Sequence, residues 1–233
     1  MNTEEIEKEL GELQLSDSFF PTGMFASSNG LEFLFTEKKI RNASDLAEII
    51  RININQQVGP SDCVALSNVF EEIDKNNFDG IIKTDQVLFS TKSIKENRDA
   101  SVRSGVQLVR CVCEFIKNDE ILNQYKESMI KNKVCGVFPI AFAICCNALK
   151  IKKEKSMIMF LHGFIVMMVG AALRLGLIQH FEGQKIIHSM KPIISKTVKE
   201  YSNKSLFEMW QFAPQIDIVQ MSHEKMNSKM FIT

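Results

Sequence analysis

Two long stretches without a charged residue constrain this chain more than any other feature of its sequence. They cover residues 134–149 and 156–173, and the charged segment 152–155 separates them. The second stretch holds 18 residues. As an α-helix it would be about 27 Å long, against about 30 Å for the hydrocarbon core of a bilayer. Length alone therefore leaves a transmembrane hairpin marginal.

Polar and helix-bending residues inside both stretches favour a protein environment over lipid. Pro139 and Asn147 lie in the first stretch, and His162 lies in the second. Such groups are costly in a bilayer and find partners more readily inside a protein. We therefore expect two central helices, buried by their own domain and by a second subunit in a homodimer, and no membrane association.

The rest of the chain shows helical rather than strand periodicity. Apolar residues recur at helical spacing over 44–58, and Val102, Val106 and Val109 form a stripe within 93–117. With 45% hydrophobic composition, 233 residues can bury one large core. We predict an all-α, single-domain bundle of about eight to ten helices over 13–212, a polar N-terminal segment over 1–12, and a C-terminal tail over 213–233.

Local signals place several helix boundaries. Gly59-Pro60 should end one helix and begin another, because proline suits the first turn of a helix. Ser93 and Glu96 have the spacing of a capping box, which would open the helix over 93–117. Pro192 should break the helix that precedes it. The segment 74–80 is predicted to be a polar turn and not a calcium-binding loop, because Phe78 and Asp79 occupy the places where such a loop needs Asp or Asn and then Gly.

Composition excludes several classes of function. Lys plus Arg and Asp plus Glu each number 28, and the sequence pI is about 6.9, so a nucleic-acid partner is not expected. The acidic N-terminus lacks the pattern of a signal peptide, which favours the cytoplasm. The six cysteines lie in apolar segments without zinc-finger spacing, and they are expected to be reduced thiols.

No catalytic or nucleotide-binding motif is present. The sequence lacks a P-loop, a nucleophile elbow, an HExxH zinc motif and a dinucleotide-binding glycine pattern. Glu96, Arg98, His162 and Arg174 are the ionisable candidates for an unrecognised all-α enzyme. His180 and His188 lie two helical turns apart, too far to bind one metal from a single helix. A stand-alone nickel- or zinc-binding protein is a further alternative.

The segment 13–32, LQLSDSFFPTGMFASSNGLE, predicts a shaped loop between two helices. Pro21 fixes its own backbone angle, while Gly23 and Gly30 can adopt conformations that a Cβ disfavours. Ser28 is a candidate N-cap for a helix that begins at Asn29 or Gly30. We call residues 13–32 the signature segment.

Four stretches of the chain, taken together, resemble the urease accessory protein F (UreF) family. The signature segment resembles the family's opening pattern, 96–108 its ExRxASxxxGxxL block, and Arg174-Leu175 with Gly183-Gln184 a later run. The tail resembles its closing pattern around His223-Glu224. The chain departs from the family at Val137, Ala143, Leu177, Gln179, His180, Lys229 and Ile232.

The resemblance implies a non-catalytic, all-α chaperone for the nickel enzyme urease. Such a protein pairs with an accessory protein called UreD or UreH, recruits the GTPase UreG and helps to deliver nickel to apo-urease. Nickel is then cargo, and no cofactor is bound stably. The implied partner-binding residues are Pro21, Gly23, Phe25, Ser28, Gly30 and Glu32 in the signature segment, Glu96, Arg98, Ser101, Gly105, Arg174 and Gln184 in the helical blocks, and His223, Glu224, Ser228, Lys229, Met230 and Phe231 in the tail.

For several of these residues a purely structural role is an open alternative. Ser101 and Gly105 would let another helix approach closely, and Arg174 could neutralise the carbonyls at a helix C-terminus. The tail carries Met226, Met230 and Phe231, which would be exposed unless they dock. A partner's groove or the chain's own domain would cover them.

Overall fold

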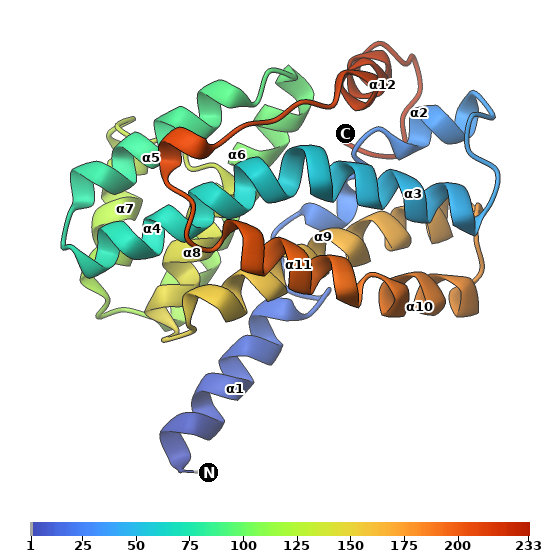
Figure 1. Cartoon of the computed structure of the whole chain (residues 1–233). Coiled ribbons are helices and arrows are strands. Elements are labelled where there is room, and N and C mark those ends of the chain that lie inside the picture. The colour runs from blue at the N-terminus through green and yellow to red at the C-terminus, as the bar shows by residue number, and fades with distance from the viewer. Residues whose placement is uncertain (1) are drawn as a thin grey trace.

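The computed structural model describes residues 2–233, apart from the side chains of Glu4 and Phe25, and its regular elements over this range are all helical (Figure 1). In chain order they are α1 (Thr3–Ser16), η1 (Met24–Ala26), α2 (Leu31–Thr36), α3 (Ala43–Asn53), the π-helical segment η2 (Ile54–Cys63), α4 (Val64–Asp74), α5 (Phe78–Thr91), α6 (Lys95–Phe115), α7 (Glu120–Ile130), α8 (Phe138–Ala148), α9 (Lys153–Arg174), α10 (His180–Ser189), α11 (Lys191–Tyr201), η3 (Leu206–Glu208) and α12 (Pro214–Glu224). The predicted all-α class is confirmed.

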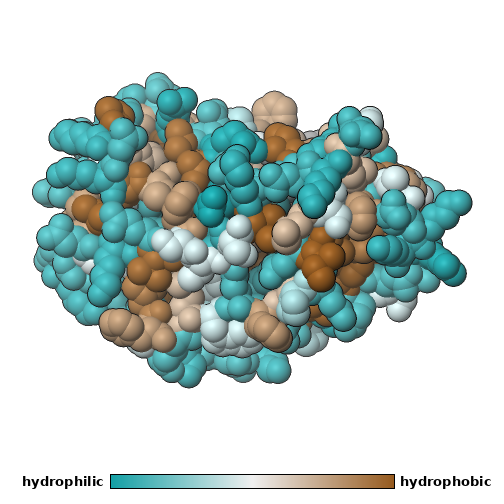
Figure 2. All heavy atoms as spheres, turned by 90° about the horizontal axis from the view of Figure 1, so that it is seen from above, coloured by the Kyte–Doolittle hydropathy of each residue, from teal (hydrophilic) through white to brown (hydrophobic). Residues whose placement is uncertain are grey.

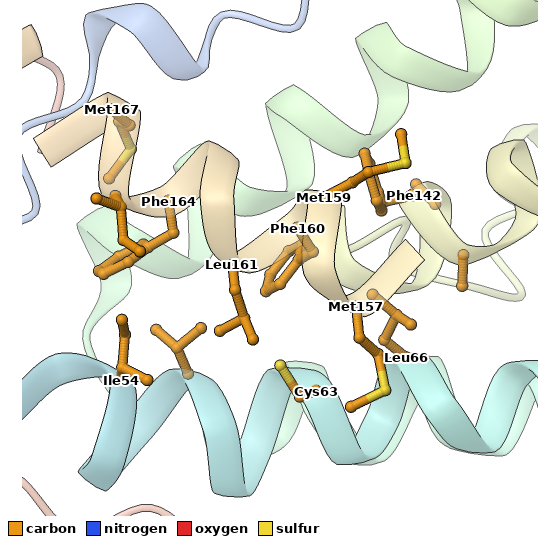
Figure 3. Packing of buried hydrophobic residues seen from close by; sticks show 14 of the residues in the cluster. Ile54, Cys63, Leu66, Phe142, Met157, Met159, Phe160, Leu161, Phe164 and Met167 are labelled. Atoms are coloured by element: carbon orange, nitrogen blue, oxygen red, sulfur yellow. The ribbon is translucent and has the colours of Figure 1, made fainter. Parts of the chain in front are cut away.

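The two uncharged stretches form α8 and α9, which lie at the centre of one hydrophobic core. Side chains of α9, among them Met157 and Leu161, face Cys63 at the end of η2 and Leu66 on α4 (Figure 3). Among residues 2–233, α9 is the helix long and apolar enough to span a membrane, but 67% of its apolar window is buried inside the fold. It therefore has the environment of a core helix.

The predicted break at Gly59-Pro60 is wrong, because α3, η2 and α4 form one continuous helical run from Ala43 to Asp74. The π-helical geometry of η2 accommodates Pro60, whose missing N–H would leave a gap in an ordinary α-helix. A Cβ on Gly59 would lie 2.7 Å from the carbonyl oxygen of Ile54 and 3.0 Å from Thr197. Glycine is thus required here by close packing.

A close helix crossing joins α6 to the segment that enters α8. A Cβ on Gly105 would lie 2.1 Å from the carbonyl oxygen of Gly136, so only glycine permits this approach. Ser101 accepts a 3.1 Å hydrogen bond from the backbone amide of Phe138. The role predicted for these small residues in a helix crossing is confirmed.

A buried carboxylate on α5 organises the same segment. Asp85 is fully buried, and it accepts hydrogen bonds from the Tyr125 hydroxyl and from the backbone amides of Cys135, Gly136 and Val137. Burial raises the pKa of Asp85, and these four donors offset the rise only in part. Val137 contributes its backbone amide here, which any residue except proline could supply.

Several helix ends differ from the predictions. The N-terminal helix continues past residue 12 to Ser16, and it projects from the body of the molecule (Figure 1). The helix α6 is capped by Ile94 without a side-chain hydrogen bond, so the predicted capping box is absent. Glu96 instead bonds to the tail, as described below.

The predicted break near Pro192 is confirmed by the junction of α10 and α11.

Candidate functional site

The signature segment turns sharply at Gly30, where α12 crosses it. Gly30 has a φ of +83° and directly precedes α2, and a Cβ there would lie 2.8 Å from Cγ1 of Val219 on α12. Gly23 also has a positive φ, +80°, at the start of η1. Positive φ and the close approach of α12 together explain why residue 30 is glycine. The helix α2 begins at Leu31, one or two residues later than predicted.

Backbone and hydroxyl groups of the signature segment bind the last residues of the tail. The amide of Ser28 donates to the Thr233 carbonyl over 2.8 Å, and the Ser28 hydroxyl donates to the same oxygen. The amide of Ile232 donates to the Ala26 carbonyl over 2.8 Å. Ser28 Oγ also accepts from the Glu32 amide at 3.3 Å, which is the predicted contact with a first-turn amide.

Glu32, on the first turn of α2, is the main acceptor for the tail. Its side chain is buried, and its two oxygens accept the backbone amides of Met230 at 2.7 Å and Phe231 at 3.1 Å. Burial by itself would raise the pKa of Glu32, but these two amides and His223 outweigh it and hold the pKa below its ordinary value. Glu32 is therefore an ionised anchor.

His223, on α12, joins Glu32 to Glu96 on α6. Its Nε2 lies 3.1 Å from Oε2 of Glu32, and its Nδ1 lies 2.7 Å from Oε2 of Glu96. The ring is completely buried. Lys229 completes the cluster with a 2.8 Å contact from Nζ to Oε1 of Glu96 and a 3.0 Å bond to the Glu224 carbonyl. We call Glu32, Glu96, His223 and Lys229 the tail cluster.

A chain of amide side chains lies beside the tail cluster, and sequence reasoning missed it. Asn29, whose φ is +54°, donates to Asn53 over 2.8 Å. Its side-chain oxygen accepts from Asn97 at 3.1 Å and from Gln220 at 3.0 Å. The adjacent pair Asn29-Gly30 in a predicted loop was the available signal, since asparagine tolerates the left-handed conformation. These bonds join α12 to α6 and α3.

The signature segment, the start of α6 and the tail, which are far apart in sequence, therefore form one surface. A family model described as UreF matches residues 40–191, which is more than half of the chain. The chain is also 31% identical over 231 residues to the urease accessory protein UreF of Trichodesmium erythraeum, with 99% of each chain covered.

The chain belongs to the UreF family.

Other members are similar along nearly their whole length. The UreF of a Bacillus species (strain TB-90) is 28% identical over 220 residues, covering 94% of this chain and 96% of the relative. That of Actinobacillus pleuropneumoniae serotype 5b is 25% identical over 221 residues, covering 95% and 97%. These relatives are named accessory proteins of urease, which indicates an accessory role for the family.

The tail of this UreF-family chain packs on its own domain. For Phe231 the family resemblance implied a partner's groove, with the chain's own domain as the open alternative, and in the structure only 3% of its surface is exposed. The Arg174 guanidinium stacks 4.5 Å from the centre of the Phe231 ring. Arg174 Nε also donates to the Gly170 carbonyl over 3.0 Å, so its predicted role near the C-terminus of α9 is confirmed.

The other proposed partner-binding residues lie outside the tail cluster. Arg98 packs 5.0 Å from the Phe89 ring and donates to the Lys92 carbonyl over 3.2 Å. Gln184 lies on an exposed part of α10, on the far side of α3 from α12 (Figure 1). The remaining positions are the α6–α8 crossing for Ser101 and Gly105, and exposed segments for Pro21, Glu224 and Ser228. Phe25 lies in η1, and its side chain is outside the described part of the molecule.

Apolar side chains remain exposed around the docked tail. The exposed fraction is 62% for Ile218 and 49% for Met221 on α12, and 65% for Met230 and 44% for Ile232 in the tail. Figure 2, which views the face carrying α12, shows apolar groups interrupting a largely hydrophilic surface. We call these four residues the tail patch. Docking of the tail thus buries Phe231 and leaves the four residues of the tail patch exposed.

No group of three or more His, Cys, Asp or Glu side chains within residues 2–233 is arranged to hold a metal ion. In the tail cluster the two ring nitrogens of His223 face different carboxylates on opposite sides. The geometry there supports hydrogen bonding between elements rather than coordination of one ion.

Proposed function

We propose that this chain is a non-catalytic, cytoplasmic scaffold for urease maturation. In this proposal it binds a UreD/UreH-like accessory protein, recruits and regulates the GTPase UreG, and supports transfer of nickel into apo-urease. Membership of the UreF family supports the general accessory role. The observation that carries the proposal is the convergence of the signature segment, α6 and the tail on one surface.

The tail patch is the proposed contact for the UreD/UreH-like protein. Its four apolar residues are exposed, although the backbone amides of Met230 and of its neighbour Phe231 are fixed by hydrogen bonds to Glu32. A rigid, partly apolar surface loses little conformational entropy on binding, which favours a stable complex. Glu32 and Phe231 then act indirectly, because they hold Met230 and Ile232 in place.

Titration calorimetry with the cognate UreD/UreH-like protein tests this contact. Met230→Asp should weaken the complex by about 2 kcal/mol, roughly thirtyfold in Kd, because it places a charge in an apolar contact. Ile130→Asp is the matched control, since Ile130 is 73% exposed at the end of α7, away from the tail patch. Equal affinities for both variants and the unmodified chain would refute the proposed contact.

We propose further that the chain forms a homodimer through the open face of α9. Ile158 is 42% exposed there, and nothing lies within 4 Å of the position of a Cβ on Gly163. A cavity of about 370 Å³ opens beside this face, lined in part by Phe20, Phe138 and Phe160. Exposed apolar surface of this kind is typical of subunit contacts.

Light scattering at tens of micromolar tests the homodimer. The unmodified chain should have the mass of a dimer, and Gly163→Arg should have the mass of a monomer with an unchanged circular dichroism spectrum. A monomeric unmodified chain would contradict this part of the proposal.

Equilibrium dialysis with nickel separates the scaffold from a stand-alone nickel- or zinc-binding protein, because a scaffold would retain no stoichiometric metal.

A further inference from the structure

The cavity beside the open face of α9 has two unlike sides. One side is an aromatic wall, in which the ring centre of Phe138 lies 5.7 Å from that of Phe142 and 6.0 Å from that of Phe160. The other side is polar, and its side chains come from η2, α6, α12 and the segment that precedes α12. The volume of about 370 Å³ is in the range of cavities that bind small molecules. A ligand that fills this cavity needs both an apolar and a polar part.

The charged side chains that line the cavity are those of three aspartates and one lysine, namely Asp17, Asp62, Asp217 and Lys92. The lysine is already paired, since its Nζ lies 2.6 Å from Oδ1 of Asp62. Asp217 accepts a 2.8 Å hydrogen bond from Nε2 of Gln57, and no cation among the described residues forms an ion pair with it. Burial raises the pKa of Asp217, and the bond from Gln57 offsets the rise only in part. The cavity therefore carries excess negative charge and favours a cationic ligand.

Side-chain amides make the polar side of the cavity rich in hydrogen-bond acceptors. Gln57 donates an N–H to the Asp217 carboxylate, and Gln211 donates an N–H to the backbone carbonyl of Thr91. A carboxylate and a carbonyl only accept, so these bonds determine which end of each amide is the nitrogen. The amide oxygens of Gln57 and Gln211 receive no hydrogen bond from the described residues. Both oxygens are therefore available to a donor on a ligand.

Gln220 adds a third oxygen of this kind. It donates to Asn29 over 3.0 Å, Asn29 donates to Asn53 over 2.8 Å, and Asn53 donates to the backbone carbonyl of Ile49 over 2.9 Å. Because the last acceptor is a carbonyl, every amide in this series has a fixed direction, and the oxygen of Gln220 is left without a donor among the described residues. Oδ1 of Asn97, another residue that lines the cavity, is buried without a partner in the same part of the chain. Such unmatched acceptors indicate a ligand that donates hydrogen bonds. We call the following four residues the acceptor rim: Gln57, Gln211, Asp217 and Gln220.

A guanidinium group meets these requirements better than other charged groups. It has a positive charge, five N–H donors and no acceptor, and its plane can stack on an aromatic ring. An ammonium has three donors and is more strongly hydrated, so it loses more when the cavity excludes water. A phosphate or a carboxylate would place its own acceptors against those of the acceptor rim, which disfavours an anionic ligand.

We propose that the cavity binds a small guanidinium compound, with the guanidinium at the acceptor rim and an apolar body against the aromatic wall. A free small molecule fits better than an arginine side chain of a partner protein, because the cavity is concave and its walls come from several elements that would surround the whole ligand. The site goes beyond the scaffold role proposed above and does not depend on it, since all of its residues belong to one chain.

Titration calorimetry of the full chain with benzylguanidinium tests the site. This compound should bind once per chain with a Kd of about 1 mM or below, as expected for a ligand of its size. Benzylurea has nearly the same shape but no charge, and its carbonyl oxygen would face other acceptors, so it should bind at least about tenfold more weakly. In NMR spectra of the unmodified chain, the side-chain amide signals of Gln57 and Gln211 should shift with benzylguanidinium and reach saturation.

Two variants and a matched control sharpen the test. Asp217→Asn keeps the shape of the side chain and an oxygen for Gln57 but removes the charge, so the affinity for benzylguanidinium should fall at least about tenfold. Gln211→Met removes one acceptor from the rim and should lower the affinity about threefold or more. Asp79→Asn makes the same chemical change as Asp217→Asn at an exposed position on α5, and it should bind benzylguanidinium like the unmodified chain.

Three results would overturn the proposal. The first is the absence of saturable binding of benzylguanidinium up to about 10 mM, where even a weak specific ligand binds. The second is equal affinity for benzylurea and benzylguanidinium, which would mean that the cavity selects the apolar body alone. The third is binding of an arginine-containing peptide without binding of benzylguanidinium, which would assign the site to a partner's side chain. All three readouts use the unmodified protein, so failure of a variant to fold leaves the test intact.

Discussion

Oε2 of Glu32 lies 3.1 Å from Nε2 of His223, although 191 residues separate the two in sequence. This contact joins two distant parts of the chain, because Glu32 is the last residue of the signature segment and lies on α2, while α12 precedes the last residues of the tail. Glu32 adds bonds to the amides of Met230 and Phe231. The signature segment and the tail therefore form one structural unit, which contacts α6 through Glu96.

The first prediction concerns acid pH. The pKa of Glu32 is held below its ordinary value by its donors, so its contribution to tail docking is present above the ordinary range of a glutamate. That contribution is lost as the pH falls through the lowered pKa, below about 4. The methyl signals of Thr233 should show release there, while Glu32→Gln should show a partly released tail already near neutral pH.

The second prediction separates stability from exposure among the aromatic residues. Phe231→Ala should lower the free energy of unfolding by about 3 kcal/mol, because the ring is buried and the cavity left behind cannot fill completely. Phe207, which is 88% exposed, is the control, and Phe207→Ala should cost less than about 0.5 kcal/mol. Urea unfolding measures both. Equal losses would mean that the tail does not dock as described.

The third prediction concerns the buried carboxylate of Asp85 on α5, which binds the segment that enters α8. Asp85→Ala should destabilise the protein by at least about 3 kcal/mol, because it leaves a hydroxyl and three backbone amides without their acceptor. Asp79, exposed in the first turn of the same helix, provides the control, with an expected loss below about 1 kcal/mol. Urea denaturation is again suitable. A small effect at residue 85 would contradict the anchoring role.

The fourth prediction concerns the crossing of α6 with the entry to α8. Gly105→Ala places a Cβ against backbone atoms, so it should destabilise by about 1–3 kcal/mol or more. Gly11→Ala on α1 should be neutral or stabilise by about 0.5–1 kcal/mol, since its Cβ would meet only the Leu149 side chain at an ordinary distance of 3.7 Å. Melting temperatures of the two variants test the contrast.

The sequence was sufficient to predict the main helices, but not the continuous helix through Pro60 or the tertiary contact of Glu96. Uncharged stretches and apolar spacing indicated α8, α9 and the all-α class, since burial depends on residue type and period. The predicted helix break at Pro60 was wrong, because a π-helical turn that accepts proline is rare and has no simple sequence signature. The predicted capping box of Ser93 and Glu96 was also wrong, because the spacing of the two residues takes no account of a tertiary partner such as His223.

Several residues of the site could be identified from the sequence, but their contacts with one another could not be predicted. The family resemblance identified Glu32, Glu96 and His223 but gave no indication that they contact one another. For Phe231 the sequence left open whether a partner or the chain's own domain covers it, because an apolar residue in a predicted tail gives no sign of what it packs against. The bonds of Asn29 to Asn53 and Asn97 depend on helices that meet only in the folded chain.

We propose that this chain is a scaffold that joins a UreD/UreH-like protein to UreG. Size-exclusion chromatography with light scattering, on mixtures of the three purified proteins, tests it most directly. UreG should elute with the UreD/UreH-like protein only when the chain is present, and Met230→Asp should reduce the amount of this assembly while Ile130→Asp leaves it unchanged. Elution of UreG with the UreD/UreH-like protein in the absence of the chain, or failure of the chain to join either protein, would contradict the proposed scaffold role.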